Sequence, residues 1–176
     1  MTVNLSISDD PRPILLVDVD GVLNPWEAEF CPDGFAEYEF FPGERVLLSP
    51  AHGELLTSLA GAYELVWATA WEDNANRFIC PVLALPRLPV IEFPIDGRDP
   101  LFRKLPAVAE AVGSRPCAWI DDVHPPDHYE WAATRGVPTL IVDINPAEGL
   151  TATIAEQLAQ WAATLASRDG REGTCT

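Results

Sequence analysis

Three short apolar runs, far apart along the chain, most constrain what this sequence can fold into. They occupy residues 13–17, 63–68 and 116–120. Nearly unbroken apolar runs of this length are typical of strands buried on both faces of a parallel sheet. Parallel strands need long crossover connections, usually helices. The runs therefore predict a parallel sheet with helices packed against both faces.

The remaining patterns extend this prediction to an alternating order of strands and helices. A helix is expected after Pro106, which would lie in its first turn, up to Gly113 at its end. The other expected elements are strands near 89–93 and at 139–143, and helices at 50–59, 73–83, 127–135 and 150–166. The alternation predicts an α/β fold, with a doubly wound (Rossmann-like), mainly parallel five-stranded sheet. One domain is expected, with its core at about 13–166.

A small β-hairpin flap is expected at about 27–42. Its turn would be Pro32-Asp33-Gly34, which lies between Phe30 and Phe35. Residues 2–11 and 167–176 are expected to be loose, because they are polar and lie at the ends of the chain.

Composition and charge narrow the classes of partner. The chain has 176 residues, of which 48% are hydrophobic, and a net charge of −16. This charge disfavours nonspecific binding to nucleic acids, which needs Lys and Arg to neutralise phosphates; an acidic, solubilising surface is the simpler explanation. The sequence has no run of membrane-spanning length and no signal-peptide pattern. We therefore expect a cytoplasmic protein with reduced cysteines, at positions 31, 80, 117 and 175.

Polar side chains follow each of the three apolar runs. Asp18 and Asp20 follow the first run, Thr69 the second, and Asp121 and Asp122 the third. In open parallel sheets, ligands bind beyond the carboxyl ends of the strands, so these side chains are expected to share one crevice. Two acidic clusters and a hydroxyl are suited to a metal-dependent phosphoryl-transfer site. Acidic pairs also occur in ordinary turns after strands.

Lys104 supplies the cation that such a site needs. It precedes the helix that ends near Gly113. A lysine near a helix N-terminus opposes the helix dipole, but it can join the dipole in binding a phosphate. The alternative is a solvated surface lysine.

In their order, these motifs resemble those of the haloacid dehalogenase-like (HAD) hydrolases. The matching positions are Asp18 to Val22, Thr69, Lys104 and the pair Asp121-Asp122. The resemblance spans residues 13–145. Response-regulator receivers use similar residue types in a different chain order, so they fit less well.

The resemblance implies a role for each residue. Asp18 would be the nucleophile that forms an aspartyl-phosphate, and Asp20 would protonate the leaving alcohol and later take a proton from water. Thr69 and Lys104 would bind the phosphoryl oxygens. Mg²⁺ would be held by an Asp18 oxygen, the Asp20 carbonyl and an acid of the pair Asp121-Asp122.

Of that acidic pair, Asp122 is preferred as the direct metal ligand, because Asp127 follows at a spacing that the family often uses for a supporting acid. The short interval between Asp20 and Thr69 leaves no room for a cap domain. The resemblance is therefore to capless members, with an open site.

Aromatic and histidine residues beside the motifs each have two interpretations. Trp26 and Trp71 follow the first and second motifs, where they would stack a flat group at the pocket rim or serve as core residues. His124 would line the site or pack in a loop, and no role is assigned to His52 or His128.

The leading functional hypothesis is a Mg²⁺-dependent phosphatase acting on a phosphorylated small molecule, with a nucleotide among the candidates. One alternative is a phosphatase that processes nucleic-acid ends, for which the acidic charge requires a partner protein to deliver the end. The other is a HAD-fold binding or regulatory module without turnover. Neither a membrane nor free nucleic acid is expected as a partner.

Overall fold

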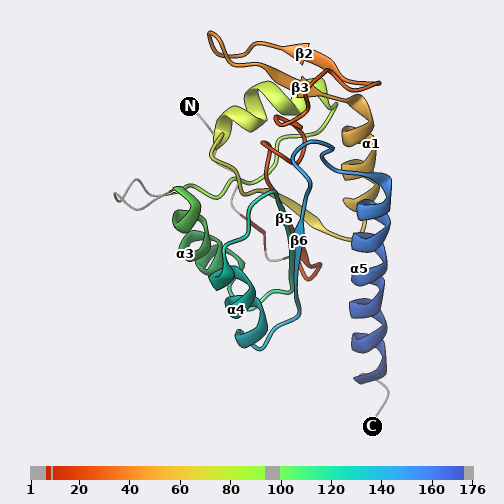
Figure 1. Cartoon of the computed structure of the whole chain (residues 1–176). Helices are drawn as coiled ribbons and strands as arrows, with labels where there is room; N and C mark the ends of the chain where they lie inside the picture. The colour runs from red at the N-terminus through yellow and green to blue at the C-terminus, as the bar shows by residue number, and fades with distance from the viewer. Residues whose placement is uncertain (1–6, 9, 94–99, 173–176) are drawn as a thin grey trace.

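Four parallel strands form the central sheet of the computed structural model, which describes residues 7–8, 10–93 and 100–172 (Figure 1). The strands are β1 (Ile14–Val17), β4 (Glu64–Trp67), β5 (Cys117–Asp121) and β6 (Thr139–Asp143). Their order is β4-β1-β5-β6, and every neighbouring pair is parallel. The apolar runs form the three adjacent strands β4, β1 and β5, which confirms the predicted parallel sheet.

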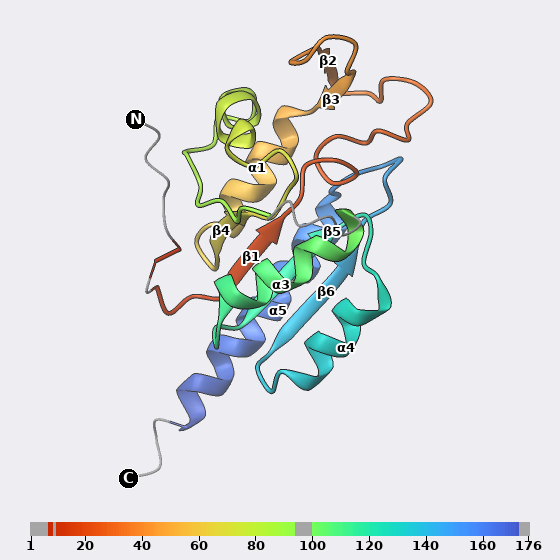
Figure 2. The same ribbon diagram turned by 90° about the vertical axis from the view of Figure 1, so that its left-hand side faces the viewer.

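The strand registers bring the carboxyl ends of the strands to one edge of the sheet. Val17 at the end of β1 is opposite Trp67 in β4 and Ile120 in β5. The backbone N–H of Asp18 continues the ladder by donating to the carbonyl of Ile120 at 3.2 Å. The arrows of β1 and β6 point toward the side of the molecule that carries the small β2–β3 hairpin (Figure 2). Residues that follow β1 and β5 therefore meet at this edge.

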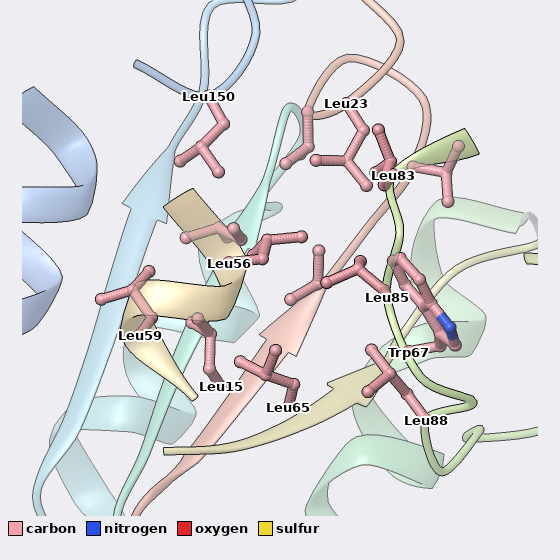
Figure 3. Close-up of a cluster of buried hydrophobic side chains, with 14 of the residues drawn as sticks. Leu15, Leu23, Leu56, Leu59, Leu65, Trp67, Leu83, Leu85, Leu88 and Leu150 are labelled. Carbon is pink, nitrogen blue, oxygen red and sulfur yellow. The ribbon is translucent and has the colours of Figure 1, made fainter. Parts of the chain in front are cut away.

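One face of the sheet is covered by α1 (Pro50–Leu59) and α5 (Ala152–Glu172) (Figure 1). Leu56 and Leu59 of α1 pack with Leu15 of β1 in a cluster of buried side chains (Figure 3). The bounds of α1 are those predicted, because Ser49 Oγ caps the helix by accepting from the backbone N–H of Ala51, with Pro50 in the first position.

The other face is covered by α3 (Pro100–Val112) and α4 (Pro126–Thr134) (Figure 2). Val108 of α3 packs with Leu16 and Trp119 of the sheet. The helix α3 begins earlier than predicted, so that Pro106 lies inside it rather than in its first turn. Lys104 is therefore the fifth residue of a longer helix.

The small hairpin is present, but its turn differs from the prediction. Its strands are β2 (Ala36–Tyr38) and β3 (Val46–Leu48), which pair antiparallel and are joined by residues 39–45. The predicted turn at Pro32 does form, since the N–H of Phe35 donates to the Pro32 carbonyl, but it precedes β2. The connecting loop uses Gly43 at a φ of +80° instead.

The predicted five-stranded sheet is not confirmed. Within the described residues, the segment expected as a fifth strand makes an isolated bridge between Val90 and Trp67. The N–H of Trp67 donates to the Pro89 carbonyl, and the N–H of Ile91 donates to the Trp67 carbonyl. Pro89 has no N–H with which to extend the ladder. Residues 94–99 lie outside the described part of the chain.

The helix predicted at 73–83 is shorter and irregular. It consists of a π-helical turn, η1 (Ala75–Ile79), and the short α2 (Cys80–Val82). The buried Asn76 lies in this irregular segment, and its side chain bonds the backbone N–H and C=O of Leu88 and the indole of Trp67. The bonds to Leu88 fix the segment to the chain that follows it.

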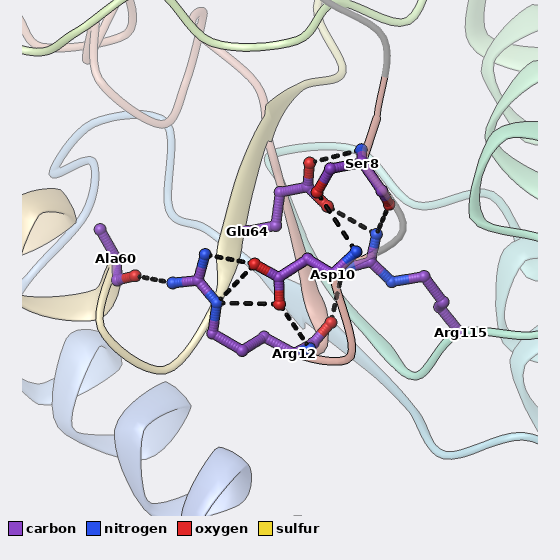
Figure 4. A network of polar contacts seen from close by, with 6 residues as sticks. All are labelled: Ser8, Asp10, Arg12, Ala60, Glu64 and Arg115. Atoms are coloured by element: carbon purple, nitrogen blue, oxygen red, sulfur yellow. Dashed lines mark hydrogen bonds and ion pairs between the residues drawn. The ribbon is translucent and has the colours of Figure 1, made fainter.

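Some residues of both segments that were expected to be loose are held in the structure. The N–H of Ser8 donates to Glu64 Oε1 at 2.8 Å, and Arg115 donates to the Ser8 carbonyl and to Glu64 Oε2 (Figure 4). The expectation of a loose segment is therefore wrong for this residue, and residues 1–6, 9 and 173–176 are outside the described chain. At the other end, α5 continues to Glu172.

Cys31, Cys80 and Cys117 are free cysteines, and Cys175 lies outside the described residues. None of the helices in the described ranges has the length and apolar character needed to cross a membrane.

Candidate active site

Three carboxylates and one amine meet beyond the ends of β1 and β5. Lys104 Nζ lies 2.6 Å from Asp18 Oδ2 and 2.6 Å from Asp121 Oδ2. One carboxylate oxygen from each of Asp18, Asp121 and Asp122 falls within a group whose atoms are all within 4.8 Å of one another. The structure thus brings together four of the residues singled out in the sequence, from three separate segments.

The charges in this cluster do not balance. Three carboxylates carry three negative charges against the one positive charge of Lys104. Burial raises the pKa of Asp121, of whose side chain 2% is exposed, and the charge of Asp18 raises it further. Burial also raises the pKa of Asp122, against a hydrogen bond from Trp26 that lowers it. The cluster therefore favours binding of a further cation.

Lys104 itself stays charged. Only 16% of its side chain is exposed, and burial alone would lower the pKa of a lysine. The charges of Asp18 and Asp121 outweigh this effect and raise the pKa of Lys104 above its usual value. Lys104 pairs with both Asp18 and Asp121, so its proton is held firmly. Its single positive charge cannot neutralise both carboxylates. Lys104 is also the only lysine of the chain, a signal in the sequence that we had not used.

Gly21 allows the two acidic segments to approach each other. It has a φ of +74°, in the left-handed region that favours glycine. A Cβ at this position would lie 2.3 Å from the Cβ of Asp122. The loop after β1 and the loop after β5 are thus in direct contact, and only a residue without a side chain fits between them.

Asp20 lies beside the cluster and not within the group of three carboxylates. Its Oδ1 accepts from Asn24 Nδ2 at 2.8 Å, and its Oδ2 accepts from Trp71 Nε1 at 2.8 Å. The position implied for its carbonyl, as a metal ligand, stays a prediction. Thr69, two residues after β4, is fully buried, and its Oγ1 accepts from the backbone N–H of Trp71 at 3.3 Å.

A cavity of about 400 Å³ adjoins the cluster on the side of the hairpin. Asp20 and Trp26 both lie in its wall, and Trp26 Nε1 also donates to Asp122 Oδ2 at 3.1 Å. The remaining lining residues are Asn24, Glu44, Arg45, Val46 and Trp71. The carboxylate of Asp20 therefore lies in the wall of a cavity beside the acidic cluster.

The two tryptophans differ in their surroundings. Trp26 is 54% exposed, as expected for a side chain at the rim. Trp71 is 9% exposed, packs against Phe40 and Phe41 of the hairpin loop, and has its N–H engaged by Asp20. The structure thus favours the rim interpretation for Trp26 and the core interpretation for Trp71.

Asp127 and the three histidines make other contacts than those of the acidic cluster. Asp127 is exposed in the first turn of α4. His124 and His128 contact each other through their Nδ1 atoms, 3.0 Å apart, and pack on Trp119. Burial lowers the pKa of His124 to about 4, so this ring is neutral at physiological pH. His52 is buried against Phe35.

Asn24 is a site residue that the sequence analysis missed. It is 3% exposed, and its Oδ1 accepts from the backbone N–H of Leu47 in β3 while its Nδ2 donates to Asp20. The available signal was its position, since an amide in an otherwise apolar loop must find partners once it is buried. Arg45 of the cavity wall was missed as well.

Comparison of the chain with models of known protein families and with curated proteins gave no match. The arrangement of the side chains is therefore the basis for assigning chemistry. Carboxylate oxygens converging from three positions are ligands that suit a hard divalent cation such as Mg²⁺. A lysine beside them can bind an anion, and a separate carboxylate faces a cavity.

Proposed function

We propose that this protein is a Mg²⁺-dependent phosphatase of the HAD type, which hydrolyses a phosphorylated small molecule through an aspartyl-phosphate. The observation that carries the proposal is the contact of Lys104 with both Asp18 and Asp121, with Asp122 beside them and Asp20 at the adjoining cavity. Its location at the carboxyl ends of parallel strands supports the proposal, because open parallel α/β sheets bind ligands there.

In the proposed reaction, an oxygen of Asp18 attacks phosphorus as the bond to the leaving oxygen breaks. Asp20 gives its proton to that oxygen, so the alcohol leaves neutral. Asp20 then takes a proton from the water that attacks the phosphoryl group on Asp18, which releases phosphate and restores both acids. Lys104 and Thr69 bind phosphoryl oxygens.

A divalent cation fits the acidic cluster on charge as well as on donor type. Two negative charges remain after Lys104 is counted if all three carboxylates are ionised, and burial together with the charge of Asp18 raises the pKa of Asp121. Asp18, Asp122 and Asp121 would hold the ion. When bound, Mg²⁺ would offset the charge of the phosphate and keep the carboxylates ionised.

The test is phosphate release from a panel of phosphorylated compounds with Mg²⁺, comparing the intact protein with Asp18→Asn. We expect a loss of about 10³-fold or more in the variant. Asp33→Asn, the same change at an exposed acid in the loop before β2, is the matched control and should keep full activity. Chelation should abolish release, and Mg²⁺ should restore it.

Other outcomes would support the alternatives. Release that is indifferent to Asp18→Asn would contradict the proposal. Mg²⁺-dependent ligand binding without release would support a binding module. Release from 3′-phosphorylated oligonucleotides but not from small phosphate esters would support end processing, despite the net charge of −16.

A further inference from the structure

The carboxylate of Asp20 is held from two sides by side-chain donors. Asn24 Nδ2 donates to Oδ1 and Trp71 Nε1 donates to Oδ2, both at 2.8 Å. Hydrogen bonds to a charged acceptor are stronger than those between neutral groups. Each carboxylate oxygen has two lone pairs, so one on each oxygen remains for the cavity. The pair of bonds therefore fixes the plane of the carboxylate without blocking its exchange of a proton.

The first donor is anchored on the hairpin. Asn24 is buried, and its Oδ1 accepts from the backbone N–H of Leu47 at 2.9 Å. Leu47 belongs to β3 and is paired with Glu37 of β2. The amide thus joins Asp20 directly to the paired strands of the hairpin.

The second donor is anchored on the loop of the same hairpin. The ring centroid of Trp71 lies 6.2 Å from that of Phe40 and 5.6 Å from that of Phe41. The backbone next to it is strained, because Glu72 has a φ of +48°. This strained turn and the two aromatic contacts hold the indole with its N–H toward Asp20.

We infer that Trp71 and Asn24 are positioning residues for Asp20, through which the β2–β3 hairpin sets the geometry of the proton-transfer step. This inference rests on the proposed function for its kinetic consequence. The hairpin lies over the end of the sheet that carries the site (Figure 1). Displacing the hairpin would move both Asn24 and Trp71. The carboxylate of Asp20 would therefore be correctly oriented only while the hairpin is in this position.

The kinetic test uses leaving groups that differ in their need for an acid. Trp71→Phe removes the indole N–H and keeps an aromatic ring against Phe40 and Phe41. We expect kcat/KM to fall about 10- to 100-fold for an alkyl phosphate, which needs a proton on its leaving oxygen. For 4-nitrophenyl phosphate, whose leaving group is stable as an anion, the loss should be less than about threefold.

Three variants complete this comparison. Asp20→Asn should show the same selectivity for leaving groups, with larger losses. Trp161→Phe, the same change in a tryptophan that stacks on Tyr63, should leave both substrates unaffected. Phe41→Leu should reproduce part of the selective loss if the hairpin acts through Trp71. Equal losses on both substrates for Trp71→Phe would overturn the inference, because a merely structural role has no preference among leaving groups.

A second measurement is independent of turnover. In a ¹H–¹⁵N spectrum, the indole signal of Trp71, assigned by its loss in Trp71→Phe, should be shifted downfield by the bond to a carboxylate. Asp20→Asn should move this signal upfield and leave that of Trp161 in place. An unmoved Trp71 signal would overturn the contact itself. Absence of phosphate release from any compound, with a moved signal, would instead count against the proposed function alone.

Discussion

The two ends of the central sheet use charged side chains in opposite ways. At the amino ends of the strands, cations and acids are matched, since Arg115 pairs with Glu64 and Arg12 with Asp10. At the carboxyl ends, Asp18 and Asp121 share Lys104, and Asp122 lies beside them without a cation of its own in the described part of the chain.

Several further donors of the arginines at the amino ends go to backbone carbonyls, although the buried Nε of Arg115 has no partner among the residues that the structure describes. Arg115 reaches those of Ser8 and Arg12, and Arg12 reaches that of Ala60 (Figure 4). A set of groups that satisfy one another stabilises the fold, whereas an unbalanced set retains the capacity to bind. The comparison separates a structural end of the molecule from the end that carries the candidate site.

The largest effect is expected from Lys104→Met at the carboxyl ends. It leaves two buried carboxylates without their partner, so the free energy of unfolding in the presence of a chelator should fall by about 3 kcal/mol. Phosphate release should fall by about 10²-fold or more. Urea denaturation with chelator and with Mg²⁺ measures the first effect. Mg²⁺ should recover part of the stability, and an unchanged stability in chelator would show that Lys104 does not stabilise the carboxylates.

Arg115→Met, at the amino ends of the strands, should lower the stability of the protein but leave its activity nearly unchanged. It breaks the pair with Glu64 and removes donors from two carbonyls, so we expect a loss of about 2 kcal/mol in the free energy of unfolding. The value of kcat/KM should stay within about twofold, since the change is at the far end of the sheet. Arg77→Met, at an exposed position, is the matched control. A large loss of activity in stably folded Arg115→Met would refute the separation of the two ends.

The two ends should also respond to pH with opposite signs. The hydrogen bond from Arg12 lowers the pKa of Asp10 to about 2. Burial would raise the pKa of Glu64, but the bonds from Ser8 and Arg115 lower it. A carboxyl whose folded pKa is depressed contributes stability at pH values above its unfolded pKa of about 4, and this contribution is lost as the pH falls toward 2.

Asp121 has the opposite sign, because burial and Asp18 raise its pKa to about 7. Without metal, the folded state takes up a proton near pH 7 and the unfolded state only near pH 4, so stability should rise by about 1 kcal/mol or more as the pH falls across that range. Thermal melting in chelator at a series of pH values measures both changes in stability. Asp121→Asn should remove the change between about pH 7 and about pH 4, and Asp10→Asn should remove part of the change below about pH 4. A stability that changes in one direction only across the whole range would contradict the comparison.

The smallest effect is expected at an exposed ion pair on the β2–β3 hairpin. Arg45 Nε lies 2.8 Å from Glu37 Oε2 on the hairpin, with both side chains exposed. Exposed pairs contribute little, so Glu37→Gln should change the free energy of unfolding by less than about 0.5 kcal/mol. Denaturation under the same conditions as for Arg115→Met provides the scale. A loss comparable to that of Arg115→Met would mean that burial is not what distinguishes the amino-end pairs.

Sequence patterns predicted correctly those helices and strands whose bounds depend on residues within a few positions. The helix α1 and the strand β6 have the predicted bounds, because a capping serine with a following proline and a short apolar run each act within a few residues. The meeting of Asp18 with the acids after β5 followed from strand ends alone. The hairpin turn, the π-helical turn around Asn76 and the isolated bridge at Val90 depend on contacts with distant segments.

The same limit applies to the candidate site. The bond from Trp71 to Asp20 joins residues 51 positions apart, and the bond from Trp26 to Asp122 joins residues 96 apart. No periodicity in the sequence encodes such pairs. They exist because two loops and a hairpin are brought to one edge of the sheet by strands that the sequence does reveal.

The place of the only lysine has a practical consequence for labelling. Lys104 is largely enclosed between Asp18 and Asp121, and its raised pKa keeps it protonated and thus poorly nucleophilic. No other lysine side chain competes for an amine-reactive reagent. Acylation of Lys104 would therefore report on the opening of this cluster. The rate of acylation would record how often Asp18 and Asp121 release the amino group of Lys104.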